Sequence, residues 1–99
     1  MNLLKDNICG KRLINLKKDD TALFLVLDDR SIISIYNRVG LFTEDSLLGK
    51  TITDIGCNKE SFKIIFDNIE KIEVGMKDND YNGPEAFFYH GSNGVLISG

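Results

Sequence analysis

Apolar residues in the first half of the chain recur at the spacing of β-strands. In Ala22–Leu27 every second residue is leucine, as a strand with a buried face requires. Phe24 and Val26 lie between these leucines and are also apolar, so we expect this strand to be covered on both faces. Neighbouring strands are expected at Gly10–Lys17 and Ser31–Asn37.

The same pattern returns when the sequence is shifted by 39 residues, which places Gly10-Lys11 on Gly49-Lys50. The matched apolar positions are Leu13 and Ile52, Leu16 and Ile55, Leu23 and Phe62, Leu25 and Ile64, Val26 and Ile65, Leu27 and Phe66, Ile33 and Ile72, and Ile35 and Val74. We therefore expect two copies of a three-stranded unit, at about residues 8–38 and 47–77. The strands of the second copy are expected at Gly49–Cys57, Ser61–Phe66 and Ile69–Met76. Asp28-Asp29 and Asp67-Asn68 are expected to form the tight hairpin turns, because Asp and Asn tolerate positive φ.

A helix is the rival interpretation of the segment Lys59–Glu73. Its apolar residues also fit one helical face, and these are Phe62, Ile65, Phe66, Ile69 and Ile72. Its repeat partner, Leu23–Ile35, has poor helical phase and is rich in β-branched and aromatic residues. The repeat therefore favours strands in both copies.

The remaining segments predict a link and a closing hairpin. Val39–Leu48 connects the copies and contains one expected helical turn at Thr43–Ser46. A polar loop, Lys77–Pro84, follows the second copy. Ala86–His90 and Val95–Ser98 flank a turn with two glycines, which predicts a hairpin within residues 85–98.

Together these elements predict a single domain, residues 1–99, with an all-β fold of about eight strands. The pattern does not distinguish a small sandwich from a barrel, and it leaves the strand order open. Apolar residues make up 42% of the chain and charged residues 27%, which excludes a disordered chain, a collagen-like chain and a coiled coil. The longest apolar run, Leu23–Leu27, is far shorter than the ~20 residues that span a bilayer, so no membrane partner is expected.

Charge and cysteine content narrow the functional classes. Twelve basic and fifteen acidic residues give a net charge of −3, which argues against nucleic-acid binding. The N-terminus lacks the features of a signal peptide, and the two cysteines, Cys9 and Cys57, are few for a secreted domain of this size. We expect a cytoplasmic protein with reduced thiols, and no zinc site because no metal-ligand spacing of Cys and His occurs.

One segment has the beginning of a calcium-binding loop. Asp78–Gly83 places oxygen ligands at alternate positions before a glycine. The match then ends, because Pro84 follows the glycine and Tyr89 stands where a bidentate glutamate is needed. We expect a solvated turn without a metal ion, with a bound cation as the alternative.

Catalytic motifs are not found. His90 is the only histidine, and nothing in the spacing places Cys9 or Cys57 beside it. The chain contains neither a G-x-S-x-G elbow nor a glycine-rich phosphate loop. Adjacent carboxylates such as Asp19-Asp20 and Asp28-Asp29 fall in predicted turns, where backbone conformation explains them. We therefore expect no enzymatic activity and no cofactor.

The distribution of charge indicates a possible binding surface. Residues 1–45 contain seven basic and seven acidic residues, whereas residues 46–99 contain five basic and eight acidic residues. Carboxylates surround a tyrosine in this second half, a composition that is typical of protein-binding surfaces. The expected contact residues are Asp78, Asp80, Tyr81 and Glu85, with Tyr89 and His90 as further candidates. A solvated loop beside a hairpin packed wholly into the core is the alternative.

Three segments of the sequence resemble small all-β bacterial domains: Leu48–Ile55, Phe62–Asn68 and Tyr81–Ala86. Some proteins of that kind are immunity proteins of contact-dependent growth inhibition and other polymorphic toxin systems. The resemblance covers mainly Leu47–Ser98, and the stretch Tyr81-Asn82-Gly83-Pro84-Glu85-Ala86 is its most distinctive part. It implies a cytosolic antitoxin that binds a toxin domain and blocks its active site without catalysing a reaction.

The leading hypothesis is an immunity protein whose partner is a cognate toxin, with a basic nuclease domain as the favoured class. An acidic inhibitor is steered toward the positive cleft of such a nuclease. The alternative is a non-enzymatic regulatory or structural module that pairs through the exposed edge of Val95–Ser98. A third hypothesis, an enzyme that uses clustered carboxylates, would require a pocket in which they converge. The oligomeric state and the binding face are left open.

Overall fold

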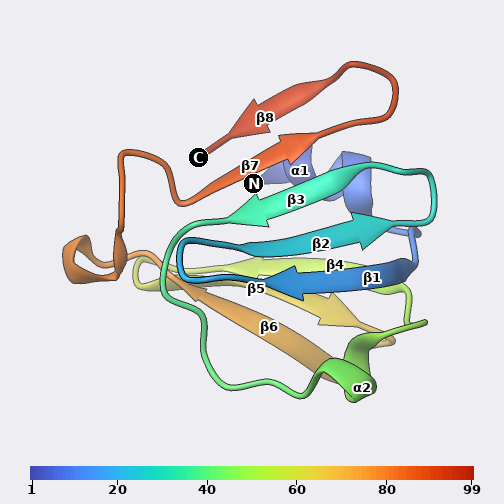
Figure 1. Cartoon of the computed structure of the whole chain (residues 1–99), viewed down its shortest axis with the longest axis horizontal. Helices are drawn as coiled ribbons and strands as arrows, with labels where there is room; N and C mark the ends of the chain where they lie inside the picture. Colours follow the sequence, from blue (N-terminus) through green and yellow to red (C-terminus); the bar gives the residue numbers. More distant parts are fainter.

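The computed structural model describes all residues, 1–99, and contains eight strands in two antiparallel sheets. The five-stranded sheet lies in front of the three-stranded sheet in Figure 1. Its order is β1-β2-β3-β7-β8, with β1 at Leu13–Lys18, β2 at Leu23–Leu27, β3 at Ile32–Ile35, β7 at Phe87–His90 and β8 at Leu96–Ser98. The order of the second sheet is β4-β5-β6, with β4 at Ile52–Cys57, β5 at Ser61–Phe66 and β6 at Glu70–Gly75. The predicted all-β fold is confirmed.

The segment Lys59–Glu73, for which a helix was the rival interpretation, forms β5 and the first part of β6. The predicted hairpin at the end of the chain is also present as β7 and β8, and Gly94 in its turn has a φ of 89°. A left-handed backbone conformation of this kind favours glycine because a Cβ would collide with the backbone.

Three short helices accompany the strands. The helical turn expected at Thr43–Ser46 is present as α2 (Glu44–Leu47), and the loop after β6 contains the 3₁₀ turn η1 (Asp78–Asp80). The sequence pattern did not predict α1 (Asn2–Ile8), whose side chains Leu4 and Ile8 are spaced one turn apart and buried. Neither α-helix is long and apolar enough to cross a membrane.

The internal repeat extends to fine details of the backbone. The β1–β2 pairing contains a bulge between Leu13 and Asn15, and the β4–β5 pairing contains the same bulge between Ile52 and Asp54, 39 residues later. A helix precedes the first strand of each copy, ending at Ile8 in one and Leu47 in the other. The repeat unit is therefore a short helix followed by three antiparallel strands.

Hydrogen bonds exchanged between the copies join the two sheets at one corner. The Gly10 N–H donates to the Ile52 carbonyl at 2.8 Å, and the matching Gly49 N–H donates to the Leu13 carbonyl at 2.8 Å. A β-bridge between Arg12 and Thr51 lies at this corner. At the opposite edge, Val39 bridges to Val74 of β6, where the chain passes from β3 to the second sheet. These two bridged corners give the sandwich a barrel-like closure.

The core lies between the sheets and is contributed about equally by both copies. Leu25 of β2 and Ile64 of β5 occupy matched positions, and both are fully buried. Phe62 of β5 meets Phe87 of β7 edge to face, with 5.3 Å between ring centroids. This arrangement is the favoured geometry of aromatic pairs, and it packs the closing hairpin onto the second copy.

The tight turns of the two copies differ. In the second copy Asp67 and Asn68 have φ values of 52° and 61°, as predicted for this pair. In the first copy the prediction of positive φ at Asp28-Asp29 is wrong, because the left-handed residue is Arg30, with a φ of 74°. The two loops have the same length, since the Arg30 N–H closes onto the Leu27 carbonyl at 2.9 Å and the matching Ile69 N–H closes onto the Phe66 carbonyl at 3.0 Å. A three-residue hairpin loop can place its left-handed residue last, as the first copy does.

Candidate protein-binding surface

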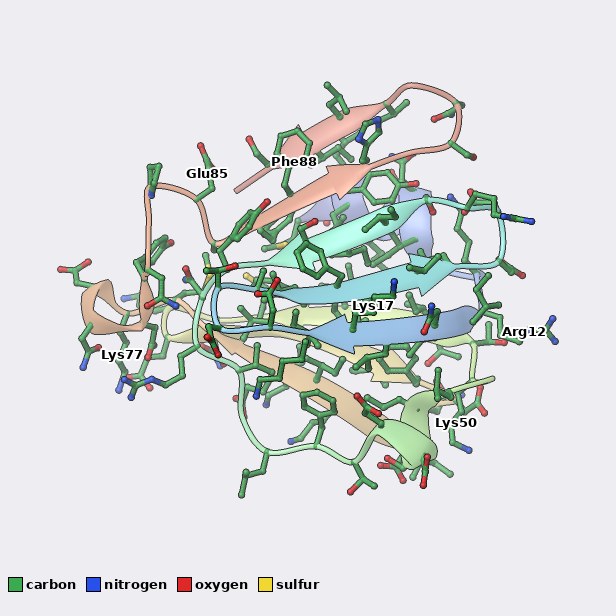
Figure 2. All side chains as sticks on the ribbon, viewed as in Figure 1. Arg12, Lys17, Lys50, Lys77, Glu85 and Phe88 are labelled. Atoms are coloured by element: carbon green, nitrogen blue, oxygen red, sulfur yellow. The ribbon has the colours of Figure 1, made fainter.

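The six predicted contact residues lie in separate parts of the molecule. Asp78, Asp80 and Tyr81 lie in and directly after η1, near Lys77 at the left end of Figure 2. Glu85 extends from the loop that leads into β7, and His90 is the last residue of β7, at the opposite end of that strand. They therefore do not form one continuous acidic site.

The 3₁₀ turn is tied to the body of the protein by its own polar groups. The Asp80 carboxylate accepts a hydrogen bond from the Lys77 N–H at 3.2 Å, and the Asp80 carbonyl accepts one from the Arg38 N–H at 2.9 Å. Tyr81 is half-buried and packs against the core beside Met76. Asp78 is exposed. Of these three residues, Asp78 has the side chain most available to a partner.

Tyr89 has to be removed from the predicted contact surface. Its side chain is 1% exposed and faces the core, because Phe87 and Tyr89 occupy the inner side of β7. Alternation along β7 leaves Phe88 and His90 on the outer side, where Phe88 is half-buried and His90 is exposed. The outward aromatic of this strand is therefore Phe88.

Phe88 belongs to a set of apolar side chains on the outer side of the five-stranded sheet, which we call the outer apolar face. Cross-strand register places Phe88 and Phe24 on either side of Ser34 in one row. In the next row Ile32 lies between Val26 and His90, with Leu96 beyond His90. The full set is Ile14, Phe24, Val26, Ile32, Tyr36, Phe88 and Leu96.

No element of the chain covers this face. Figure 2 looks onto it, with Phe88 and Lys17 projecting from the sheet. Ile14, Ile32 and Leu96 are 45%, 37% and 58% exposed, and the other members of the face are half-buried. The expectation that the strand containing Phe24 is covered on both faces is therefore wrong. Contiguous exposed apolar side chains of this kind mark interaction surfaces in soluble proteins.

The second copy provides an internal comparison, because its outward positions are known from the repeat. Phe24 corresponds to Lys63, Ile32 to Lys71, and Ser34 to Glu73. Lys63 and Glu73 pair across the strands at 3.9 Å, and Ile65 is the one large apolar side chain among the outward residues of these strands. The three-stranded sheet thus has an ordinary charged surface, whereas the equivalent surface of the first copy is apolar.

A polar cluster lies beside the outer apolar face, where the β2–β3 turn meets the start of β1. The Lys11 ammonium lies 2.6 Å from the Asp29 carboxylate and donates to the Tyr89 hydroxyl at 3.0 Å. Burial opposes ionisation of Asp29, but hydrogen bonds from Lys11 and Ser31 outweigh it and hold the pKa of Asp29 far below its usual range. Burial of Lys11 is likewise outweighed, and its pKa is raised.

This cluster has a structural explanation. Ser31 donates to Asp29 through both its N–H and its hydroxyl, and the Ser92 hydroxyl adds a contact at 3.3 Å from the β7–β8 turn. Asp29 thereby ties the β2–β3 turn to Lys11, two residues before β1, and to the closing hairpin. The groups are paired with one another, which is the arrangement expected of buried polar groups that stabilise a fold.

Two polar grooves lie at the end of the molecule around Arg38. One, of about 240 Å³, lies between the β1–β2 turn and η1, and the other, of about 400 Å³, lies between η1 and β6. Asp19 in the first groove accepts hydrogen bonds from the N–H groups of Thr21 and Ala22, and these lower its pKa. Its carboxylate is thus used to form the turn, as the sequence predicted.

The sequence interpretation missed the outer apolar face although the repeat contained the signal. Comparison of outward positions between the copies, such as Phe24 with Lys63, shows the difference without coordinates. Comparisons of the chain with protein-family models, with curated proteins and with solved structures find no match. The candidate surface therefore depends on the geometry of this chain alone.

Proposed function

We propose that this chain is a non-catalytic protein-binding domain that acts in the cytoplasm as an immunity protein and covers the functional surface of a toxin domain. The observation on which the proposal depends is the outer apolar face. Folding does not require it, because the second copy builds the same three strands with lysine and glutamate at the matched outward positions. A partner that buries this face would gain the free energy of removing its aromatic and aliphatic carbon from water.

The architecture suits a passive inhibitor. The face lies on paired strands and not on loops, so its side chains are held in place before binding and lose little conformational freedom. Asp78, Glu85 and His90 are exposed around or beyond it. The two carboxylates, with the net charge of −3, favour a basic partner such as a nuclease domain.

The test is co-expression in bacteria of this chain with a candidate toxin domain, taken from a reading frame adjacent to its own. We expect restored growth and a stable complex on size-exclusion chromatography. Val26→Asp should weaken the complex about 100-fold, because it buries a charge in the centre of the apolar face. The matched control is Ile65→Asp, at the same position of the second copy and equally half-buried.

The control separates binding from folding, since both variants place aspartate on the outward side of a central strand. Equal rescue of growth by the two variants would show that the outer apolar face is not the binding surface. Failure of the wild-type chain to form any complex with the toxin domain would remove the immunity function itself.

A second candidate function depends on β8. This strand pairs with β7 alone, so its other edge has free N–H and carbonyl groups, and Leu96 is exposed beside it. An extended peptide from a regulatory or structural partner could add to this edge. Backbone methylation of such a peptide at alternate residues would abolish binding at the edge, whereas binding to the outer apolar face would be retained.

A further inference from the structure

The outer apolar face continues into a slot where the chain enters β7. The slot has a volume of about 300 Å³ and is lined by Thr21, Tyr36, Asn82, Gly83, Pro84 and Glu85. Its exposed walls are almost entirely carbon, although most of these residues are polar. Tyr36 follows β3 and continues its outward alternation after Ser34, so it belongs both to the slot and to the face.

Hydrogen bonds from residues on both sides of Pro84 fix the loop that lines the slot. The Asn82 side chain donates to the Tyr36 carbonyl at 2.8 Å, which ties the loop to the end of β3. The Tyr36 N–H donates to the Ala86 carbonyl at 2.8 Å on the other side of Pro84. The loop is thus held on both sides of Pro84, and the proline ring restricts it further. A ligand would enter a site that is already formed.

One charge at the slot has no partner. Glu85 is exposed and forms neither a hydrogen bond nor an ion pair through its carboxylate, whereas Asp29, Asp54, Glu60, Asp67 and Glu73 each pair with a lysine. An apolar ligand that covered Glu85 would leave this carboxylate desolvated and unpaired. The complementary ligand is therefore a cation with an apolar stem.

We propose that the slot binds an arginine side chain that projects from the otherwise apolar surface of the protein partner. Its aliphatic stem would pack against Pro84, its planar guanidinium would stack on Tyr36, and the guanidinium would pair with Glu85. Arginine fits better than lysine because its planar group can stack and pair at once. A volume of about 300 Å³ is at the lower limit for small-molecule pockets and suits one side chain. The inference rests on the proposed function and names the chemistry of the partner.

The experiment uses a library of random 12-residue peptides displayed on phage and selected on the full chain. We expect the retained peptides to contain an arginine next to apolar residues more often than the unselected library. Replacement of that arginine by citrulline, which has the same shape without the charge, should weaken binding to the wild-type chain about tenfold. With Glu85→Gln the peptide should bind about tenfold less tightly, and citrulline should then cause little further loss.

The control variant is Glu73→Gln on the three-stranded sheet, which should leave peptide affinity unchanged. If the peptides bind the outer apolar face and lose affinity with Val26→Asp, but show no dependence on arginine, Tyr36→Ala or Glu85→Gln, the slot assignment is wrong while the proposed binding face stands. If the selection yields no peptide that depends on Val26, both the binding face and the slot assignment fail.

Discussion

The two copies of the repeat share their inner sides and differ on their outer sides. Inward positions such as Leu25 and Ile64 are apolar and fully buried in both, because each sheet must fill the same core. Outward positions do not fill the core, and there the copies differ. Phe24 of the first copy corresponds to Lys63 of the second, and Ile32 corresponds to Lys71. The second copy therefore shows which features the fold needs. The additional apolar side chains on the outer side of the first copy are not explained by folding.

The largest expected effect tests the equivalence of the inner sides. Leu25→Ala and Ile64→Ala each remove a fully buried aliphatic side chain at matched positions. Each should lower the free energy of unfolding by about 3 kcal/mol, from lost burial and a residual cavity. Urea denaturation followed by circular dichroism measures both. A cost below about 1 kcal/mol for either variant would show that the two halves of the core are not equivalent.

The next effect comes from a difference between the turns of the copies. Asp29→Asn should lower the free energy of unfolding at pH 7 by about 1–2 kcal/mol, because Lys11 loses its ionic partner. Asp67→Asn is the matched control and should cost less, since Lys50 lies 4.0 Å from Asp67 and both side chains are more exposed.

The ion pair of Lys11 and Asp29 also predicts a pH dependence of stability. The pKa of Asp29 is depressed in the folded state, so its stabilising contribution is present above the unfolded value of about 3.9 and is lost as the pH falls below it. Between pH 7 and pH 3, urea denaturation should therefore show a smaller loss of stability for Asp29→Asn than for wild type. Identical pH profiles of the two proteins would contradict this assignment.

A smaller effect on stability is expected when the outer sides are made alike. Phe24→Lys and Ile32→Lys install the residues of the second copy and should together change the free energy of unfolding by less than about 1 kcal/mol. Solubility in ammonium sulfate should rise, because a contiguous apolar surface is interrupted by charge. Unchanged solubility would mean that the outer apolar face is already shielded in solution.

The smallest effect concerns the ion pair that replaces the apolar residues in the second copy. Lys63→Ala removes the partner of Glu73 at 3.9 Å on a partly exposed surface. We expect a change within about 0.5 kcal/mol in the free energy of unfolding, and less at 1 M salt. Thermal unfolding at low and high salt measures it. A larger loss in the free energy of unfolding would show that the Lys63–Glu73 ion pair has a structural role, contrary to the comparison of the two copies.

The strands were predictable because the repeat supplied a second observation of each one. The segment around Ile65 fits both a helix and a strand when read alone, and its match with Val26 decided between them. The helix α1 was not predictable in the same way. It has seven residues and no side-chain cap at Met1, so packing of Leu4 and Ile8 stabilises it and local propensity does not.

The sequence alone could not predict which side of a strand is exposed at the surface. Alternation showed that Phe88 and Tyr89 lie on opposite sides of their strand, but which side meets the core depends on the sheet that covers it. Phe62, from the second copy, packs against Phe87 of the closing hairpin and thereby fixes the inner side. The acidic residues of the η1 turn were correctly predicted to lie in a loop. The sequence did not show that the Asp80 carboxylate accepts a hydrogen bond from the backbone of that same loop.

The hydrogen bonds exchanged at the corner make the two halves of the chain mutually dependent. Gly10 and Gly49 each donate to the other copy, and Leu13 and Ile52 accept in return, which is the reciprocity of a twofold-symmetric dimer. A single unit on its own would leave these groups and half of its buried face open to water. The geometry is that of two pseudo-symmetric subunits joined in one chain by the linker through Leu41, so each half depends on the other to complete its hydrogen bonds and its core.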